Sequence, residues 1–200
     1  TITPTPVNSV PVVSNVRING GTSSINLSAN TTTNVDCTAS VTDADGYSNI
    51  QSVTAKLYRT GIGIEAGDNI NNHYIKTGDS QCIPSSGLGL SEDYICTFAI
   101  YYLADPTDIG SINEDDNWSC TVTASDIVST SAAVSVTTEM NTLTAIQVSS
   151  PLEYGTIDPG TTTGAVNKTI TVTNVGNNIL DLNILGTNMC SDYPSCAGNI

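Results

Sequence analysis

Apolar and polar residues alternate along most of the chain, with the two-residue period of a β-strand. β-Branched residues are common at the apolar positions, and Gly, Asn, Asp and Pro interrupt the runs. No window keeps the i, i+3, i+4 apolar spacing of an amphipathic helix, so the pattern predicts an all-β chain. The expected strands cover residues 14–20, 23–29, 33–43, 50–60, 80–86, 93–104, 118–126, 132–140, 143–150, 152–157, 167–174 and 179–186.

The strands group into two modules that follow an extended N-terminal segment, residues 1–13. Short strands that recur with turn signals between them are typical of a β-sandwich. We place the boundary between the modules after Met140, so that residues 14–140 form the first module and residues 141–200 the second. The linker is short, which predicts that the two modules are stacked rather than independent. Residues 61–80 are expected to form a polar, Gly-rich insertion.

The composition is strongly acidic, which limits the classes of partner. Five Lys and Arg stand against 19 Asp and Glu, for a formal net charge of -14. Nucleic acids and anionic membranes need cationic side chains at their phosphates, so we expect neither as a partner. The longest nearly apolar run, residues 95–104, is too short to span a bilayer as a helix. We therefore expect no membrane span in this chain.

The sequence offers little support for catalysis. His73 is the only His of the chain and lies in a polar stretch, where we interpret it as a surface residue. The chain has no G-x-S-x-G, no H-E-x-x-H and no phosphate-binding Gly motif. Most acidic residues lie in expected turns, where Asp favours turn hydrogen bonds. We expect a protein that is not an enzyme.

Six Cys residues indicate disulfides rather than a zinc site, because none lies in a C-x-x-C pair and only one His is present. Disulfides imply an oxidising compartment. The start at Thr1 rather than Met suggests that a signal peptide has been removed or left out of the numbering. Cys37 and Cys120 each lie in the middle of an alternating strand, and their separation of 83 residues suits a bridge between two sheets. Closing so long a loop contributes roughly 4 kcal/mol in a chain-entropy treatment. Of the fifteen pairings that six Cys allow, we expect Cys37–Cys120, Cys82–Cys96 and Cys190–Cys196.

The residues before Cys120 carry a resemblance to a known family. Asp116, Trp118 and Cys120 form D-x-W-x-C, which resembles the D-x-Y-x-C signature of immunoglobulin-like domains. In that family the aromatic residue packs under a loop and hydrogen-bonds back to the backbone. The resemblance implies an immunoglobulin-like sandwich over residues 14–140. It also implies that Trp118 and Asp116 form a corner, with the indole N–H as the donor.

The second module resembles the immunoglobulin-like repeats of secreted and surface proteins of archaea and bacteria. The resemblance rests on YGTIDPG at residues 154–160, on NKTITVTNVGNNILDLNI at residues 167–184, and on a turn from Asn174 to Asn177. The stretches VTDADG and SVTAKLY of the first module are similar to the same repeats. The resemblance implies two tandem immunoglobulin-like sandwich modules at a cell surface, with a structural or adhesive role.

The second module has four expected strands, whereas a sandwich of this class needs about seven. Half a sandwich leaves an apolar face and an open sheet edge in water. Three interpretations remain open at this point. The natural chain continues past Ile200, the module leans on the first module, or a neighbouring subunit donates a strand.

Residues 1–13 are a candidate donor strand, because Pro4, Pro6 and Pro11 favour an extended backbone. The alternative is a disordered or glycosylated stalk. Insertion of this segment into a second copy of the chain gives a head-to-tail homopolymer. The candidate donor residues are Ile2, Thr3, Thr5, Val7, Val10 and Val12.

Calcium is the one cofactor that the sequence suggests, because Ca²⁺ binds carboxylate and carbonyl oxygens. One candidate group contains Asp43 and Asp45, and solvated acidic loops are the alternative. The second candidate group contains Asp105, Asp108, Asp115 and Asp116.

The sequence suggests two relations to glycans, one as a bound ligand and one as a covalent modification. The adjacent residues Tyr101 and Tyr102 point to opposite faces of a strand, so one Tyr faces outward for sugar stacking. Four N-x-[ST] sequons are candidate glycosylation sites, at Asn26, Asn30, Asn117 and Asn167.

Taken together, these observations lead us to expect an extracellular structural protein, disulfide-stapled and located at the cell surface. We expect a subunit of a surface filament or layer that assembles by strand exchange between neighbouring subunits. The alternative is an adhesin or glycan-binding module of a larger cell-surface protein.

Overall fold

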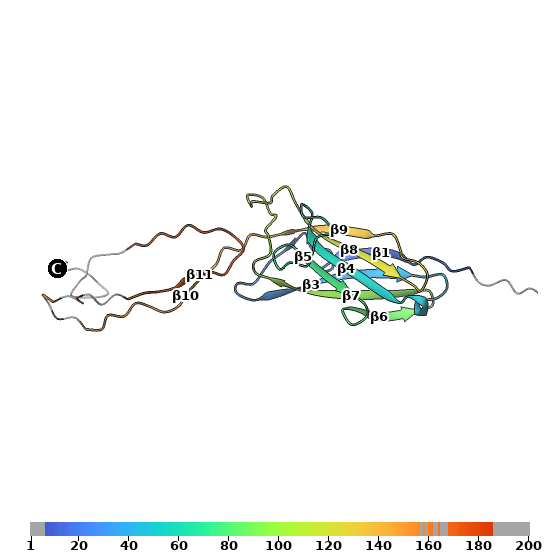
Figure 1. The fold of residues 1–200 in the computed structure, drawn as a ribbon, viewed down its shortest axis with the longest axis horizontal. Helices are drawn as coiled ribbons and strands as arrows, with labels where there is room; N and C mark the ends of the chain where they lie inside the picture. Colours follow the sequence, from blue (N-terminus) through green and yellow to red (C-terminus); the bar gives the residue numbers. More distant parts are fainter. Residues whose placement is uncertain (1–6, 157, 159, 162–163, 165–167, 186–200) are drawn as a thin grey trace, which may run out of the picture.

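The computed structural model describes residues 7–156, 158, 160–161, 164 and 168–185 of the chain. Over these residues the protein is all-β, and its only helical element is the 3-10 turn η1 (Tyr47–Asn49). Two sheets form a sandwich, and a two-stranded arm projects from one end of it (Figure 1). The first described residues leave the sandwich at the opposite end (Figure 1). No helix in the described part is long and apolar enough to cross a membrane.

The first sheet has four antiparallel strands in the order β1-β3-β7-β6. The two central strands, β3 and β7, pair along their full length without a register shift. Both edge strands are irregular, because β1 shifts register between Ser14 and Arg17 and β6 shifts between Pro84 and Ser86. Bulges of this kind protect an edge from pairing with another chain. The strands are β1 (Val12–Ile18), β3 (Thr32–Thr42), β7 (Ser91–Tyr101) and β6 (Cys82–Leu88).

The second sheet has five strands in the order β2-β9-β8-β4-β5. Its neighbouring strands are antiparallel, except that the short strand β2 runs parallel to β9. The strands are β2 (Ser24–Ile25), β9 (Val134–Met140), β8 (Trp118–Ser125), β4 (Ser52–Arg59) and β5 (His73–Thr77).

The core lies between the two sheets, where the alternation of the sequence places it. β3 and β7 bury every second residue, because neighbouring side chains of a strand point to opposite faces. β8 differs, since its first five residues are all buried. Its Thr121 is covered on the outer face by Tyr58 and Ser135, whose hydroxyl oxygens lie 3.2 Å and 2.7 Å from its own. The largest apolar side chains of the core are Trp118, Phe98, Ile18, Ile25, Leu57, Ile100 and Met140.

Two disulfides hold the sandwich together. Cys37 on β3 and Cys120 on β8 form a bridge between the two sheets, with their Cα atoms 6.5 Å apart. Cys82 and Cys96 are directly opposite each other on β6 and β7, with their Cα atoms 4.1 Å apart. Both pairings are those expected from the sequence. Buried disulfides indicate that the chain folds in an oxidising compartment.

The strand predictions differ from the structure at three places. β5 lies inside residues 61–80, which were expected to form an insertion. Its alternation is weak because it is a half-buried edge strand that pairs only with β4. Residues 12 and 13 belong to β1, so the sandwich begins before the predicted boundary. The described residues of 152–157 and 179–186 form no strand.

Some predictions concern residues outside the described part of the chain. These are the Cys190–Cys196 disulfide, the sequon at Asn167 and the donor residues Ile2, Thr3 and Thr5.

The arm consists of β10 (Ile146–Val148) and β11 (Val172–Asn174), which pair antiparallel. Asn177 fastens its base to the sandwich. The side-chain Nδ2 of Asn177 donates to the carbonyl oxygens of Ala104 and Asn141, at 2.9 Å and 3.2 Å. Its Oδ1 accepts the backbone N–H of Leu143 at 2.7 Å. One side chain thus ties together the loop after β7, the linker after β9 and the turn after β11.

Candidate functional site

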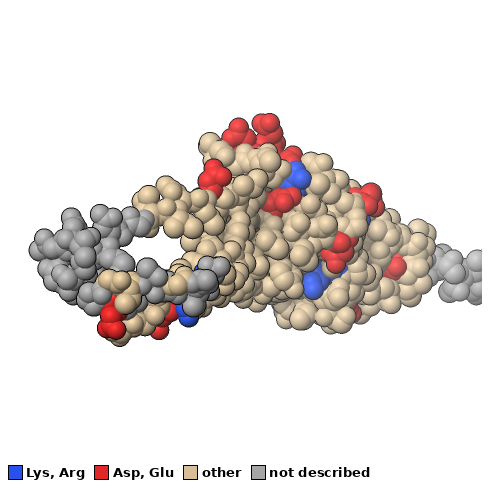
Figure 2. Space-filling view, turned by 60° about the vertical axis from the view of Figure 1, so that its left-hand side comes forward, with Lys and Arg blue, Asp and Glu red and all other residues tan. Residues whose placement is uncertain are grey.

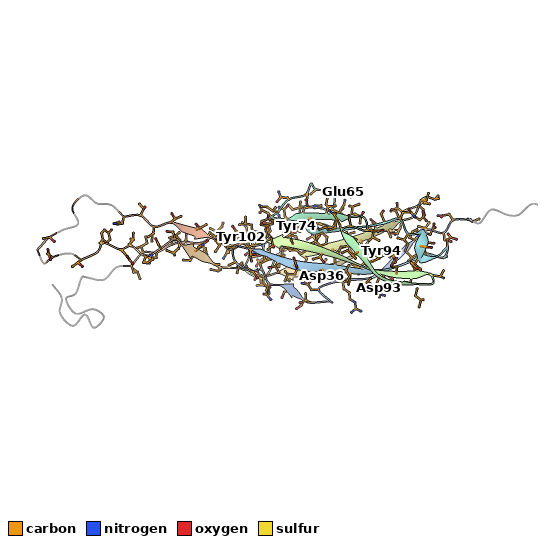
Figure 3. All side chains as sticks on the ribbon, turned by 90° about the horizontal axis from the view of Figure 1, so that it is seen from below. Asp36, Glu65, Tyr74, Asp93, Tyr94 and Tyr102 are labelled. Carbon is orange, nitrogen blue, oxygen red and sulfur yellow. A yellow bond between two sulfur atoms is a disulfide. The ribbon has the colours of Figure 1, made fainter. Side chains whose placement is uncertain are left out.

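Trp118 is completely buried at the end of the sandwich from which the arm projects. Its Nε1–H donates to the backbone oxygen of Asp105 at 2.8 Å, and its ring lies 6.1 Å from the ring of Tyr74. Burial raises the pKa of Tyr74 to about 12, and its hydroxyl oxygen accepts the backbone N–H of Tyr101. Figure 3 shows Tyr74 and Tyr102 near this end of the sandwich. Trp118 therefore packs under a loop and hydrogen-bonds back to the backbone, as the resemblance implied.

Arg59 lies between two of the acidic residues that the sequence nominated for calcium. Its guanidinium forms ion pairs with Asp105, at 2.9 Å, and with Asp116. The side chain of Arg59 is 14% exposed, and those of Asp105 and Asp116 are 25% and 22% exposed. Asn72 also donates to Asp105, at 3.3 Å. Both carboxylates are thus paired with one guanidinium, which offsets one of their two charges and holds the loop before β8 onto the sheet.

The remaining members of this second acidic group do not join Asp105 and Asp116. Asp108 accepts a hydrogen bond from the hydroxyl of Thr142 at 2.6 Å, and Asp115 is exposed. Over the described part of the chain, no three His, Cys, Asp or Glu side chains gather to hold a metal ion. The second group therefore does not form one cluster of carboxylates, because Arg59 pairs with Asp105 and Asp116 while Asp108 and Asp115 lie apart from them.

Asp43 and Asp45 of the first acidic group lie at the other end of the sandwich, in the turn after β3. Asp43 is completely buried, and Asp45 is exposed. Oδ1 of Asp43 accepts the backbone N–H of Asp45 at 2.8 Å. Oδ2 of Asp45 accepts the backbone N–H of Ser9 at 2.7 Å. The turn after β3 is thereby linked to the N-terminal residues.

A second contact at the same end involves Asp126, which follows β8. Its Oδ1 accepts the backbone N–H groups of Val128 and Ser129, both at 2.6 Å. Its Oδ2 accepts hydrogen bonds from the hydroxyl of Ser129 and from Nδ2 of Asn8, the latter at 2.9 Å. Burial alone would raise the pKa of Asp126, but these hydrogen bonds outweigh it and lower the pKa to about 2. Residues 8 and 9 are thus held between two turns of the sandwich, a contact that no local sequence pattern indicated.

His73 is not the surface residue that the sequence suggested. It is completely buried as the first residue of β5. Its Nε2 lies 3.1 Å from the carbonyl oxygen of Ile64, and its ring stacks on Tyr58 with the centroids 5.6 Å apart. The interpretation is wrong because it overlooked β5, whose pairing with β4 carries the ring into the interior.

The described sequons differ in accessibility. Asn26 and Asn30 are exposed, although each makes a side-chain hydrogen bond with the region that follows β9. Asn117 is half-buried, and Ser119 of the same sequon is buried. Exposure therefore favours Asn26 and Asn30 over Asn117 as acceptors. Of the two adjacent Tyr residues, Tyr101 is 43% exposed.

The arm exposes apolar side chains that a sandwich would bury. Ile146 and Val148 of β10 are 50% and 49% exposed. Only β10 and β11 pair in the described part of this module, so each has one edge without a partner strand there. The other exposed apolar residues beyond β10 are Leu152, Tyr154, Ile170, Ile179, Leu182, Ile184 and Leu185.

The surface carries little positive charge. Figure 2 shows acidic side chains distributed over the visible face, with only a few basic side chains among them. No protein-family model matches the chain, and no curated protein shows significant similarity to it.

Proposed function

We propose that the chain belongs to an extracellular structural protein, a subunit of a surface filament or layer in which neighbouring subunits exchange a β-strand. The arm is the observation that carries this proposal. Its two strands combine open edges with exposed apolar side chains. A sheet edge of this kind readily accepts a further strand, which pairs with the backbone and covers the apolar face.

The positions of the arm and of the N-terminal residues support a polymer rather than a closed dimer. They lie at opposite ends of the sandwich (Figure 1). A contact between the N-terminal segment of one copy and the arm of the next is heterologous, and such a contact repeats without closing. Val7, the first described residue, is 88% exposed and available for such a contact.

We limit the proposed donor strand to residues 1–7. Val12 pairs with β3 as the first residue of β1, so it belongs to the sandwich of its own chain. Asn8 and Ser9 are hydrogen-bonded to turns of the same sandwich, and Val10 lies between these anchors. Seven extended residues reach about 23 Å at roughly 3.3 Å per residue, which exceeds the length of a three-residue strand such as β10.

The strand order supports the immunoglobulin-like classification of the first module. The order β1-β3-β7-β6 corresponds to the ABED sheet of an immunoglobulin sandwich, and β4, β8 and β9 correspond to its C, F and G strands. The disulfide between β3 and β8 joins the B and F positions, as in antibody domains. Buried disulfides also support export, since they persist in oxidising compartments.

Deletion of residues 1–7 tests the proposal. We expect the full chain to form head-to-tail polymers, visible by negative-stain electron microscopy and as large species in light scattering. The deletion variant should stay monomeric with an unchanged melting temperature, because the anchors at Asn8 and Ser9 remain.

Addition of a peptide with the sequence of residues 1–7 should protect the arm of that variant from proteolysis. A Val7→Asp variant is the full-length control, and we expect it to weaken polymerisation. Polymers formed equally well by the deletion variant would refute the donor role of this segment.

A hollow on the outer face of the first sheet favours glycan binding as the second candidate function. It has a volume of about 430 Å³ and lies between the two irregular edge strands. Arg17, Ser40 and Asp93 line it with hydrogen-bonding groups, and Figure 3 shows Asp93 on β7. Tyr94 also lines the hollow but is 3% exposed, so it presents little ring surface for stacking on a sugar. A glycan-array signal from a chain that forms no polymer would favour this alternative.

A further inference from the structure

Asp43 is the acidic residue that the fold leaves partly unsatisfied. Its side chain is completely buried. Oδ1 accepts the backbone N–H of Asp45, whereas Oδ2 has no hydrogen-bond partner within the described part of the chain. Burial of a carboxylate oxygen without a partner is strongly unfavourable, because the oxygen loses its hydration and gains nothing in return. This environment calls for a cation or an ordered water beside Oδ2.

Other oxygen ligands lie close to Asp43. The next acidic residue, Asp45, lines a surface hollow of about 460 Å³ together with Val7, Asn8 and Asn49. Asp43 does not line this hollow, but its hydrogen bond to the Asp45 backbone places its carboxylate against the same turn. The hollow therefore combines one carboxylate with two amide side chains, and a second, buried carboxylate lies beside it.

No basic side chain of the described residues neutralises this group. The ion pairs there join Lys56 to Glu65, and Arg59 to Asp105 and Asp116. The two acidic groups nominated by the sequence thus differ in one respect. Arg59 supplies the positive charge for the second group, whereas the first group contains none.

We propose that Asp43 and Asp45 bind Ca²⁺ at the N-terminal end of the sandwich. Amide oxygens of Asn8 and Asn49, together with backbone carbonyls and water, complete the six to eight oxygen ligands that Ca²⁺ takes. The group has two carboxylates and falls short of three acidic ligands, so the affinity is low. A dissociation constant of about 10⁻⁴ to 10⁻³ M, as in extracellular modules, is expected. Bound Ca²⁺ would tie Asn8 to the turn after β3 and set the direction in which the N-terminal segment leaves the sandwich.

Thermal unfolding of the full chain after treatment with a chelator tests this site. Calcium at about ten times its dissociation constant should raise the melting temperature by about 3–6 °C, because it binds only the folded state. Magnesium at the same concentration should raise it less, since Mg²⁺ demands a stricter octahedral geometry. Calorimetric titration of Ca²⁺ into the full chain should give a stoichiometry near one.

Three variants locate the site. Asp43→Asn keeps the shape and an acceptor for the Asp45 N–H, and we expect it to abolish the calcium-dependent rise. Asp45→Asn changes an exposed residue, so it should fold normally and lose most of the rise even if Asp43→Asn fails to fold. Asp115→Asn removes the same charge from an exposed residue of the second group and should keep the full rise.

A wild-type melting temperature that does not respond to calcium would identify a buried water instead and overturn the proposal. A full rise in Asp45→Asn would overturn it as well. Because the full chain is expected to polymerise, the same measurements on the variant without residues 1–7, which is expected to stay monomeric, separate calcium binding from strand exchange.

Discussion

The two described disulfides close loops of very different length, and this difference allows their contributions to be separated. Cys37 and Cys120 are 83 residues apart and join different sheets, whereas Cys82 and Cys96 are 14 residues apart on neighbouring strands. All four Cys residues are at most 1% exposed. Substitution of either pair by Ala therefore removes the same buried atoms. The loss of packing nearly cancels between the two variants, and the difference in loop length remains.

The expected loss follows from the entropy of the unfolded chain. A cross-link lowers that entropy by an amount that grows with the logarithm of the loop length. For the loop between Cys37 and Cys120 the stabilisation is about 4.6 kcal/mol, and for the loop between Cys82 and Cys96 it is about 3.0 kcal/mol. We expect the double Ala variant of Cys37 and Cys120 to be the less stable of the two, by about 1.6 kcal/mol.

Urea denaturation, followed by the fluorescence of the single, buried Trp118, measures this difference. Linear extrapolation gives the free energy of unfolding of the wild type and of both variants. An equal loss in the two variants, or a larger loss without the Cys82–Cys96 bridge, would refute the reasoning. Stabilisation would then arise from contacts in the folded state rather than from the length of the loop.

Two further predictions concern charges. Arg59→Met leaves the half-buried carboxylates of Asp105 and Asp116 without their cation, and it should cost about 2 kcal/mol of unfolding free energy. That value is below the cost of breaking a fully buried pair, because these side chains are partly solvated. Lys56→Met is the control and should cost less than about 0.5 kcal/mol, because its partner Glu65 is 84% exposed. The second prediction rests on Asp126, whose pKa of about 2 lies below its ordinary value of 3.8. Its carboxylate stabilises the fold above about pH 4, and this contribution is lost as the pH falls toward about 2. The difference in unfolding free energy between the wild type and Asp126→Asn should therefore shrink over that range, and a constant difference would contradict the assignment.

Local sequence patterns were sufficient for much of the sandwich. Alternation predicted β3, β7 and β8 with ends close to those observed, because one face of each strand packs into the core. The same alternation placed Cys37 and Cys120 in mid-strand, which led to the disulfide between the sheets. The packing of Trp118 under a loop was predicted from the short motif D-x-W-x-C. Alternation failed for β5, a half-buried edge strand whose residues do not separate cleanly into two faces.

The pairing of charged residues could be identified only from the tertiary structure. Two acidic groups looked alike in the sequence, and nothing local distinguished them. Arg59 reaches one of them only because β4 pairs with β8, which brings residues 59 and 118 opposite each other. The other group lies at the far end of the sandwich and holds the N-terminal residues instead. The hydrogen bonds of Asn177 also depend on the tertiary structure. Its side-chain amide can bond to Leu143 and Ala104 only because the linker and the end of the sandwich meet there. The sequence by itself determined which residues form strands and point inward, because those preferences act between near neighbours. The tertiary structure decided which charges and amides are partners, because chain topology brings together residues that are distant in sequence.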